Sequence, residues 1–137
     1  MKQFDMQFRV RYAETDAMGI VHHAVYPVWF EIGRTEYLRE VGIPYREMES
    51  RGLQSPVIAI HVRYLKPARY DDLLTLKVRV ARYTGVRLTL HYEVYRDDVL
   101  LCTGESEHAF LNEGRATAVQ RKFEDIHEML ARCVGEA

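Results

Sequence analysis

The sequence predicts one α+β domain in which an antiparallel sheet curves around a single long helix. Two observations lead to this class. Several short segments alternate apolar with polar residues, as strands with one buried face do, whereas one long segment early in the chain repeats its apolar residues at helical spacing. Because the later strand segments follow one another as hairpins do, the sheet is expected to be antiparallel, and the helix has only that sheet to cover it. The 137 residues suit one domain, taken as residues 1–137.

The first strand and the long helix are predicted from these two periods. At residues 4–12 the apolar side chains fall on the even positions: Phe4, Met6, Phe8, Val10 and Tyr12. After a polar turn at residues 14–19, residues 24–41 place one set of apolar residues on a single helical face: Tyr26, Phe30, Gly33, Tyr37 and Val41. Trp29 and Ile32 widen this apolar surface, so the helix is expected to be well covered.

Four more strands are expected in hairpin succession, followed by a terminal helix. The segment at residues 57–65 is apolar and β-branched, which indicates a central strand, and Pro67 ends it. Alternation predicts the other three strands, at residues 74–80, 86–94 and 99–111. A short extended piece then precedes a helix whose buried stripe is formed by Phe123, Ile126, Leu130 and Cys133.

Composition narrows the class of protein. The 19 Lys and Arg residues nearly balance 20 Asp and Glu, for a net charge of −1, so global charge does not indicate a nucleic-acid surface. The first residues lack the apolar run of a signal peptide, and no stretch approaches the roughly 20 apolar residues of a membrane span. A soluble, cytoplasmic protein is therefore expected. Cys102 and Cys133 have no CxxC spacing and are interpreted as reduced packing residues.

Residues 11–26 carry the most informative motif, because they join the first strand to the long helix. This segment resembles the hotdog-fold thioesterases, in particular the 4-hydroxybenzoyl-CoA thioesterase and YbgC-like branch. That branch reads approximately R-x-x-D/E-T-D-x-x-G-x-V-x-H-x-x-Y and continues with E-x-x-R-x-E on the helix. The matching residues are Arg11, Thr15, Asp16, Gly19, Val21, His23, Tyr26, Glu31, Arg34 and Glu36. Residues 62–68, followed by Asp71 and Asp72, resemble the second recurrent stretch of the family.

The resemblance implies a hotdog fold and thioester hydrolysis, and it assigns candidate catalytic residues. Asp16 matches the catalytic carboxylate, and His23 and Tyr12 match the residues proposed beside it. The backbone N–H of His23, at a helix start, corresponds to the donor that polarises the thioester carbonyl, which agrees with the positive end of a helix dipole. Whether Asp16 attacks the carbonyl or acts as general base stays open. Asp16 could also be a turn residue, His23 a structural residue of the loop, and Tyr12 a core residue of the strand.

Further residues are candidates for substrate binding. Gly19 suits a positive φ or a close approach of substrate, and Tyr26 matches the family motif. Trp29, with Met18, is expected near the entrance, which indicates an apolar acyl group, either aliphatic or aromatic. Glu31 is a candidate contact to a neighbouring chain, although an intrahelical pair with Arg34 is the default interpretation.

Cationic residues are needed for the phosphates of CoA. The candidates flank Pro67 and the hairpin turn at residues 83–86: Arg63, Lys66, Arg82 and Arg87. Each could equally be an ordinary solvated charge. The histidines show no HExxH or Cys/His spacing, so no metal is expected, and no cofactor other than CoA as part of the substrate.

The expected function is hydrolysis of a fatty or aromatic acyl-CoA to free acid and CoA. A thioesterase acting on acyl carrier protein and a non-catalytic acyl-CoA binding module are the alternatives, whereas a hotdog dehydratase motif is not matched by residues 24–41. The resemblance also implies a homodimer, or a tetramer of two dimers, with acyl-CoA bound between subunits. Glu31, Arg63 and Arg82 are the candidates for contributing across that boundary.

Overall fold

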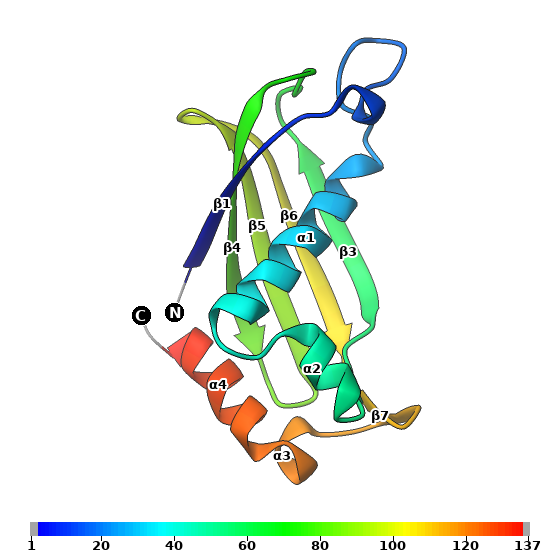
Figure 1. The fold of residues 1–137 in the computed structure, drawn as a ribbon, viewed down its shortest axis with the longest axis vertical. Coiled ribbons are helices and arrows are strands. Elements are labelled where there is room, and N and C mark those ends of the chain that lie inside the picture. The colour runs from blue at the N-terminus through cyan, green and yellow to red at the C-terminus, as the bar shows by residue number, and fades with distance from the viewer. Residues whose placement is uncertain (1–2, 136–137) are drawn as a thin grey trace.

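The computed structural model describes residues 3–135 and has a five-stranded antiparallel sheet wrapped around one long helix, which confirms the predicted fold class (Figure 1). The strand order is β1-β4-β5-β6-β3. The strands are β1 (Gln3–Arg9), β3 (Val57–Tyr64), β4 (Leu73–Tyr83), β5 (Arg87–Arg96) and β6 (Val99–Ala109). The helix, α1 (Val25–Glu40), lies across the concave face of the sheet (Figure 1).

The core lies between α1 and the inner face of the sheet. The predicted helical face is buried at Tyr26, Phe30, Gly33 and Tyr37, and the ring of Phe30 stacks on Tyr92 at 4.3 Å between centroids. Gly33 allows this close approach, because a Cβ there would lie 2.5 Å from Cδ2 of Leu76. Of the two residues expected to widen this covered surface, Trp29 is buried, whereas the side chain of Ile32 is 45% exposed.

The position of β3 differs from the prediction. Within residues 3–135 this strand lies at the edge of the sheet and pairs only with β6, so it is neither central nor the hairpin partner of β4. The reason is that β4 already has β1 on one side and β5 on the other. The strand β3 therefore pairs with the free edge of β6. The apolar character of β3 therefore does not reflect burial within this chain, since Val57, Ile58, Ile60 and Tyr64 are exposed.

The first strand is shorter than predicted. Strand β1 ends at Arg9, and Tyr12 begins a 3-10 turn, η1 (Tyr12–Glu14), with its side chain 76% exposed. The turn forms because the backbone N–H of Arg11 donates to the carboxylate of Glu14 at 2.7 Å, which ends the extended backbone. Tyr12 is therefore not a core residue, and its ring packs only at the surface, edge-on to Tyr70.

Short elements close the end of the barrel-like sheet remote from the Asp16 loop (Figure 1). They include a helix that the sequence did not predict, α2 (Tyr45–Ser50), and a small sheet of β2 (Leu53–Gln54), β7 (Leu111–Asn112) and β8 (Arg115–Ala116). Helix α3 (Val119–Lys122) leads into α4 (Glu124–Gly135). The predicted stripe of α4 is buried, as expected, at Phe123, Ile126, Leu130 and Cys133.

Two further observations concern the cysteines and the helices. Cys102 and Cys133 are both buried and are not joined in a disulfide. Over residues 3–135, none of the helices has the length and apolar character that crossing a membrane requires.

Candidate active site

The loop between β1 and α1 holds Asp16 in a tight turn. The backbone N–H of Asp16 donates to the carbonyl of Ile20 at 2.9 Å, and one carboxylate oxygen, Oδ1, accepts the N–H of Met18 at 2.8 Å. Gly19 has φ of 78°, which glycine adopts without steric cost. The second oxygen, Oδ2, accepts no hydrogen bond from any residue of the 3–135 range. Asp16 is thus a turn residue with one oxygen left for chemistry.

A cleft of about 320 Å³ opens beside this loop and brings together several of the predicted residues. Asp16, His23 and Lys66 all line it: the first two come from the β1–α1 loop, and Lys66 from the segment that follows β3. Apolar side chains form the rest of the wall, together with Tyr64 at the end of β3: Met18, Ile20, Val21, Leu65 and Pro67. An apolar wall around one carboxylate and one cation suits a thioester with a remote anionic group.

His23 contributes its backbone to this cleft. Its N–H donates no hydrogen bond to the part of the chain that the structure describes, and it precedes the first residue of α1 by two positions. Its carbonyl accepts the hydroxyl of Tyr64 at 2.6 Å, and its ring stacks on His22 at 4.2 Å. An unpaired N–H at the positive end of a helix can donate to an oxygen that gains negative charge.

Glu14 anchors the β1–α1 loop to the protein core, a role that the sequence did not reveal. Its side chain is buried, and its carboxylate accepts the indole N–H of Trp29 at 2.9 Å and the backbone N–H of Arg11. Burial by itself would raise the pKa of Glu14, but these hydrogen bonds and the Arg11 guanidinium outweigh it and hold the pKa below its usual value. Glu14 is therefore ionised at neutral pH and ties the loop to α1.

The structure assigns different surroundings to three other predicted residues. Trp29 is 2% exposed and donates to Glu14, so it supports the loop from the core and does not line the Asp16 cleft. Tyr26 is also buried, with its ring edge-on to Trp29 and Tyr64, and burial raises its pKa to about 12. Tyr12 points to solvent away from the cleft lining.

The predicted phosphate-binding cations do not converge within one chain. Lys66 lines the Asp16 cleft, whereas Arg63 lines a shallow depression on the outer face of the sheet with His61, His91 and Glu105. Arg82 and Arg87 are exposed next to the β4–β5 turn, at the opposite end of the sheet, since Arg87 pairs with Ala109. A shared phosphate site would need a second chain.

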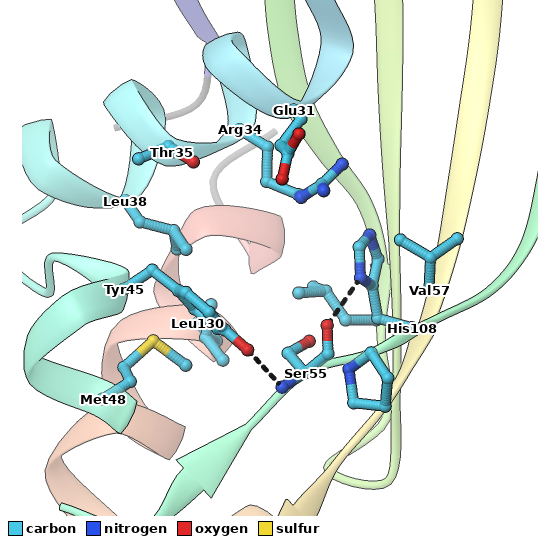
Figure 2. A pocket seen from close by; sticks show the side chains of 12 residues that line it. Glu31, Arg34, Thr35, Leu38, Tyr45, Met48, Ser55, Val57, His108 and Leu130 are labelled. Carbon is cyan, nitrogen blue, oxygen red and sulfur yellow. Dashed lines mark hydrogen bonds between the residues drawn. The ribbon is translucent and has the colours of Figure 1, made fainter. Parts of the chain in front are cut away.

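Glu31 lies outside the Asp16 cleft as well. It lines a separate cavity with Arg34, on the part of α1 that follows the buried Phe30 (Figure 2). The default expectation of a Glu31–Arg34 ion pair was wrong: within residues 3–135, Arg34 makes no ion pair with Glu31 and instead donates to the hydroxyl of Tyr92 at 3.3 Å. Over the same residues, no group of three or more His, Cys, Asp and Glu side chains is arranged to hold a metal ion.

Two residues of the site were missed by sequence reasoning. Tyr64 lay inside the second family-like stretch, but its contact with His23 joins residues 41 positions apart. Glu14 matched the acidic position of the motif, and its spacing from Trp29 on the helix gave no sign of a buried contact.

The sequence of this chain is similar to those of known thioesterases. Residues 10–132 match the model of the Thioesterase-like superfamily. A putative acyl-CoA thioesterase, YneP, of Bacillus subtilis is 42% identical over 65% of this chain, and the match spans 64% of that protein's length. The acyl-CoA thioesterase YbgC of Haemophilus influenzae is 31% identical over 85% of this chain and 86% of that protein.

Solved structures agree on the fold. A DHNA-CoA thioesterase from Staphylococcus aureus superposes with a TM-score of 0.92 at 32% identity, covering 96% of this chain and 91% of that one. A hypothetical protein, TT1821, from Thermus thermophilus gives 0.90 at 36% identity, covering 96% of this chain and 97% of that one.

Proposed function

Because the chain belongs to the thioesterase-like superfamily, we propose that it hydrolyses the thioester of an acyl-CoA to a free acid and CoA. One observation carries this proposal most directly. Asp16, with a free carboxylate oxygen, and His23, with a free backbone N–H, belong to one cleft that is otherwise mostly apolar. A thioester needs a nucleophile or base on one side of its carbonyl carbon and a hydrogen-bond donor at its oxygen.

The reaction follows from these two groups. The carbonyl oxygen accepts the N–H of His23, where the dipole of α1 stabilises the negative charge of the tetrahedral intermediate. Asp16 either removes a proton from the attacking water or itself attacks to form an anhydride that water then opens. In both routes the C–S bond breaks, CoA leaves as a thiolate and takes up a proton, and one water is consumed.

The free edge of β3 supports a homodimer as the working unit. In the part of the chain that the structure describes, the strand has a neighbour on one side only, and Ile58, Ile60 and Tyr64 have exposed apolar side chains. A second copy provides a matching edge, since two β3 strands pair antiparallel about a two-fold axis. The Tyr64 end of one strand, beside Asp16, then lies next to the Val57 end of the other.

Antiparallel pairing of two β3 strands would also bring together cationic residues that lie at opposite ends of a single chain. Arg82 and Arg87 lie at the Val57 end of their own sheet, so the partner subunit's Arg82 and Arg87 approach the Asp16 end of the first chain. With Lys66 they form the proposed site for CoA phosphates. CoA would therefore bind between subunits. Because salt screens the attraction between these cations and the phosphates, the Michaelis constant should rise with salt concentration.

A thiol-release assay with short, long and aromatic acyl-CoAs tests the proposal. Asp16→Asn should fold and bind acyl-CoA but lose about a hundredfold or more in kcat, the scale of a lost acid or base group. Asp5→Asn, an exposed change on β1, is the matched control and should retain wild-type turnover. His23→Ala should lose less than Asp16→Asn, because alanine keeps the backbone donor.

Two results would contradict this assignment. A fully active Asp16→Asn enzyme would move the catalytic carboxylate elsewhere. Tight acyl-CoA binding without any thiol release by the wild-type protein would identify a binding module, and release only from acyl carrier protein would identify the other alternative.

A further inference from the structure

At the start of α1, one residue accepts two successive backbone N–H groups. The carbonyl of His22 accepts the N–H of Val25 at 3.0 Å, and Nδ1 of its imidazole accepts the N–H of Ala24 at 3.0 Å. The N–H of His23, the residue before these two, has no acceptor in the part of the chain that the structure describes. Among residues 23–25, His22 therefore engages every N–H except the one that the proposed reaction directs at the thioester oxygen.

The two peptide groups that flank His23 are both held in place. The group after His23 has its oxygen on the hydroxyl of Tyr64, at 2.6 Å, and its N–H, which belongs to Ala24, on the ring of His22. Because a peptide group is planar, hydrogen bonds on its two opposite edges fix its rotation. In the group before His23, the carbonyl points at Val25, and a trans peptide directs its N–H the opposite way. The N–H of His23 thus points out of the helix end.

The imidazole of His22 can hold this peptide group because the residue itself is fixed. Its backbone N–H donates to the carbonyl of Glu14 at 2.9 Å, and the side chain of Glu14 is bonded to Trp29 in the core. Its ring also stacks on the ring of His23, with 4.2 Å between centroids and 27° between planes. His22 therefore connects η1 to the first peptide groups of α1.

The hydrogen bond determines where the ring of His22 carries its proton. A backbone N–H can only donate, so Nδ1 of His22 accepts and has no proton, and the proton of the neutral ring is on Nε2. A side-chain acceptor that binds the N–H two residues further along is the arrangement that asparagine forms in an Asx turn. An asparagine can therefore replace this acceptor without the imidazole.

We propose that the imidazole of His22 is a positioning residue for thioester hydrolysis: by holding the N–H of Ala24, it keeps the N–H of His23 aimed at the thioester oxygen. The inference rests on the proposed function, in which His23 supplies that donor. The motif that resembles the thioesterases leaves position 22 unspecified, so the resemblance gives His22 no role. His22 is not part of the lining of the Asp16 cleft, and it acts through the peptide group alone.

Removing the acceptor should affect catalysis more than folding. Ala24 is exposed, so water can accept its N–H when the ring is absent. The peptide group is then held by Tyr64 alone, and its rotation displaces the N–H of His23. A displacement of about 1 Å near the reacting atoms can cost about a hundredfold in rate, and we expect a partial loss of aim to cost about tenfold. Because a bond to the oxyanion strengthens in the transition state, the loss should fall on kcat and leave KM nearly unchanged.

Three substitutions at this one position separate the hydrogen bond from the ring stacking. His22→Ala removes the acceptor and the ring, His22→Phe keeps a ring against His23 without an acceptor, and His22→Asn provides an acceptor without the ring. With hexanoyl-CoA and benzoyl-CoA in the thiol-release assay, kcat should fall about tenfold in His22→Ala and His22→Phe. His22→Asn should restore kcat to within about threefold of the wild type.

The same kinetics can overturn the role of His22. A His22→Asn enzyme as slow as His22→Phe, or a His22→Phe enzyme as fast as the wild type, would assign the effect to the ring and not to its acceptor. A rise in KM at unchanged kcat would show that His22 contributes to substrate binding and does not position the oxyanion donor.

Infrared spectroscopy follows the aim of the His23 N–H without turnover. Asp16→Asn should hold an acyl-CoA unhydrolysed, so the stretching frequency of an isotope-labelled thioester carbonyl reports the hydrogen bond at its oxygen. Binding should lower this frequency in Asp16→Asn. The lowering should shrink when His22→Phe is added and return when His22→Asn is added instead. A residue that only stabilises the helix would not move this frequency, so equal lowering in all three proteins overturns the inference.

The outcomes separate this inference from the proposed function. Thiol release that does not respond to His22→Phe leaves the thioesterase intact and refutes the positioning role. A carbonyl frequency that depends on the acceptor at position 22, in a protein that releases no thiol, supports the positioning role and refutes the enzyme.

Discussion

Replacing Glu14 by Gln should loosen the Asp16 loop, because the buried carboxylate of Glu14 holds this loop against α1. One oxygen of Glu14 accepts the backbone N–H of Arg11 at 2.7 Å, and the other accepts the indole N–H of Trp29 at 2.9 Å. A glutamine side chain has one acceptor oxygen and one NH2 group. Whichever way the amide turns, its NH2 faces one of these donors, so one buried hydrogen bond is lost.

The size of the effect follows from the type of bond. A hydrogen bond to a charged group contributes about 1.5–3 kcal/mol, and Glu14 is buried, so we expect the free energy of unfolding to fall by about 2–3 kcal/mol. The additional ion pair with Arg11 adds little, because the side chain of Arg11 is largely exposed. Turnover should fall too, since η1 is next to Asp16.

Urea unfolding of Glu14→Gln, Trp29→Phe and the double variant measures this contribution. The two changes should couple by about 1–2 kcal/mol, because Trp29→Phe removes the indole donor and Glu14→Gln removes its acceptor or replaces the charged acceptor by a weaker neutral one. The folded pKa of Glu14 is lowered, so its stabilisation is present above the unfolded value of 4.5 and is lost as pH falls through the folded value. The deficit of Glu14→Gln should therefore be full at pH 7 and shrink in acid. A change in unfolding free energy below about 0.5 kcal/mol, or additive variants, would refute the anchoring role.

Other predictions concern packing, acid stability and the cleft. Gly33→Ala should cost about 1–3 kcal/mol in urea unfolding, because its Cβ would overlap Leu76 and Val78; an unchanged midpoint would show that the helix shifts freely. Burial lowers the pKa of His108 to about 4 in the folded protein, against 6.5 in the unfolded chain, so the unfolded chain binds more protons between these two pH values. The free energy of unfolding should therefore fall by about 3 kcal/mol as pH drops from 7 to 4. His108→Gln should weaken this pH dependence, and an unchanged dependence would exclude His108 as its source. Tyr64→Phe, which loses the hydrogen bond to His23, should lower kcat severalfold with a loss of about 1 kcal/mol in stability, and equal kcat would remove Tyr64 from the site. With acyl-CoA the Michaelis constant should rise with salt, whereas an acyl-pantetheine thioester should show no such rise; a shared salt dependence would exclude the phosphate contacts.

Local sequence determined much of the fold and the position of the Asp16 loop. The period of two in β1, β4, β5 and β6 marked the buried face of each strand, and the period near 3.6 in α1 and α4 marked the face of each helix. These patterns are local because burial alternates along a strand or helix whatever its neighbours are. The motif around Asp16 was readable for a similar reason, since its turn is closed by contacts within a few residues, from Asp16 to Met18 and Ile20.

Only the tertiary structure decided which distant segments meet. The apolar residues of β3 did not reveal whether the strand is central or at the edge, because a residue pattern reports the character of the side chains and not how many neighbouring strands pair with the backbone. The contact between Tyr64 and His23 spans 41 positions, and the one between His108 and Ser55 spans 53. No local period encodes such pairs, since they depend on strand order and on the curvature of the sheet around α1. The Asp16 loop was therefore foreseeable from the chain, whereas the walls of its cleft and the cavity lined by Glu31 and Arg34 arise only when the sheet closes around the helix.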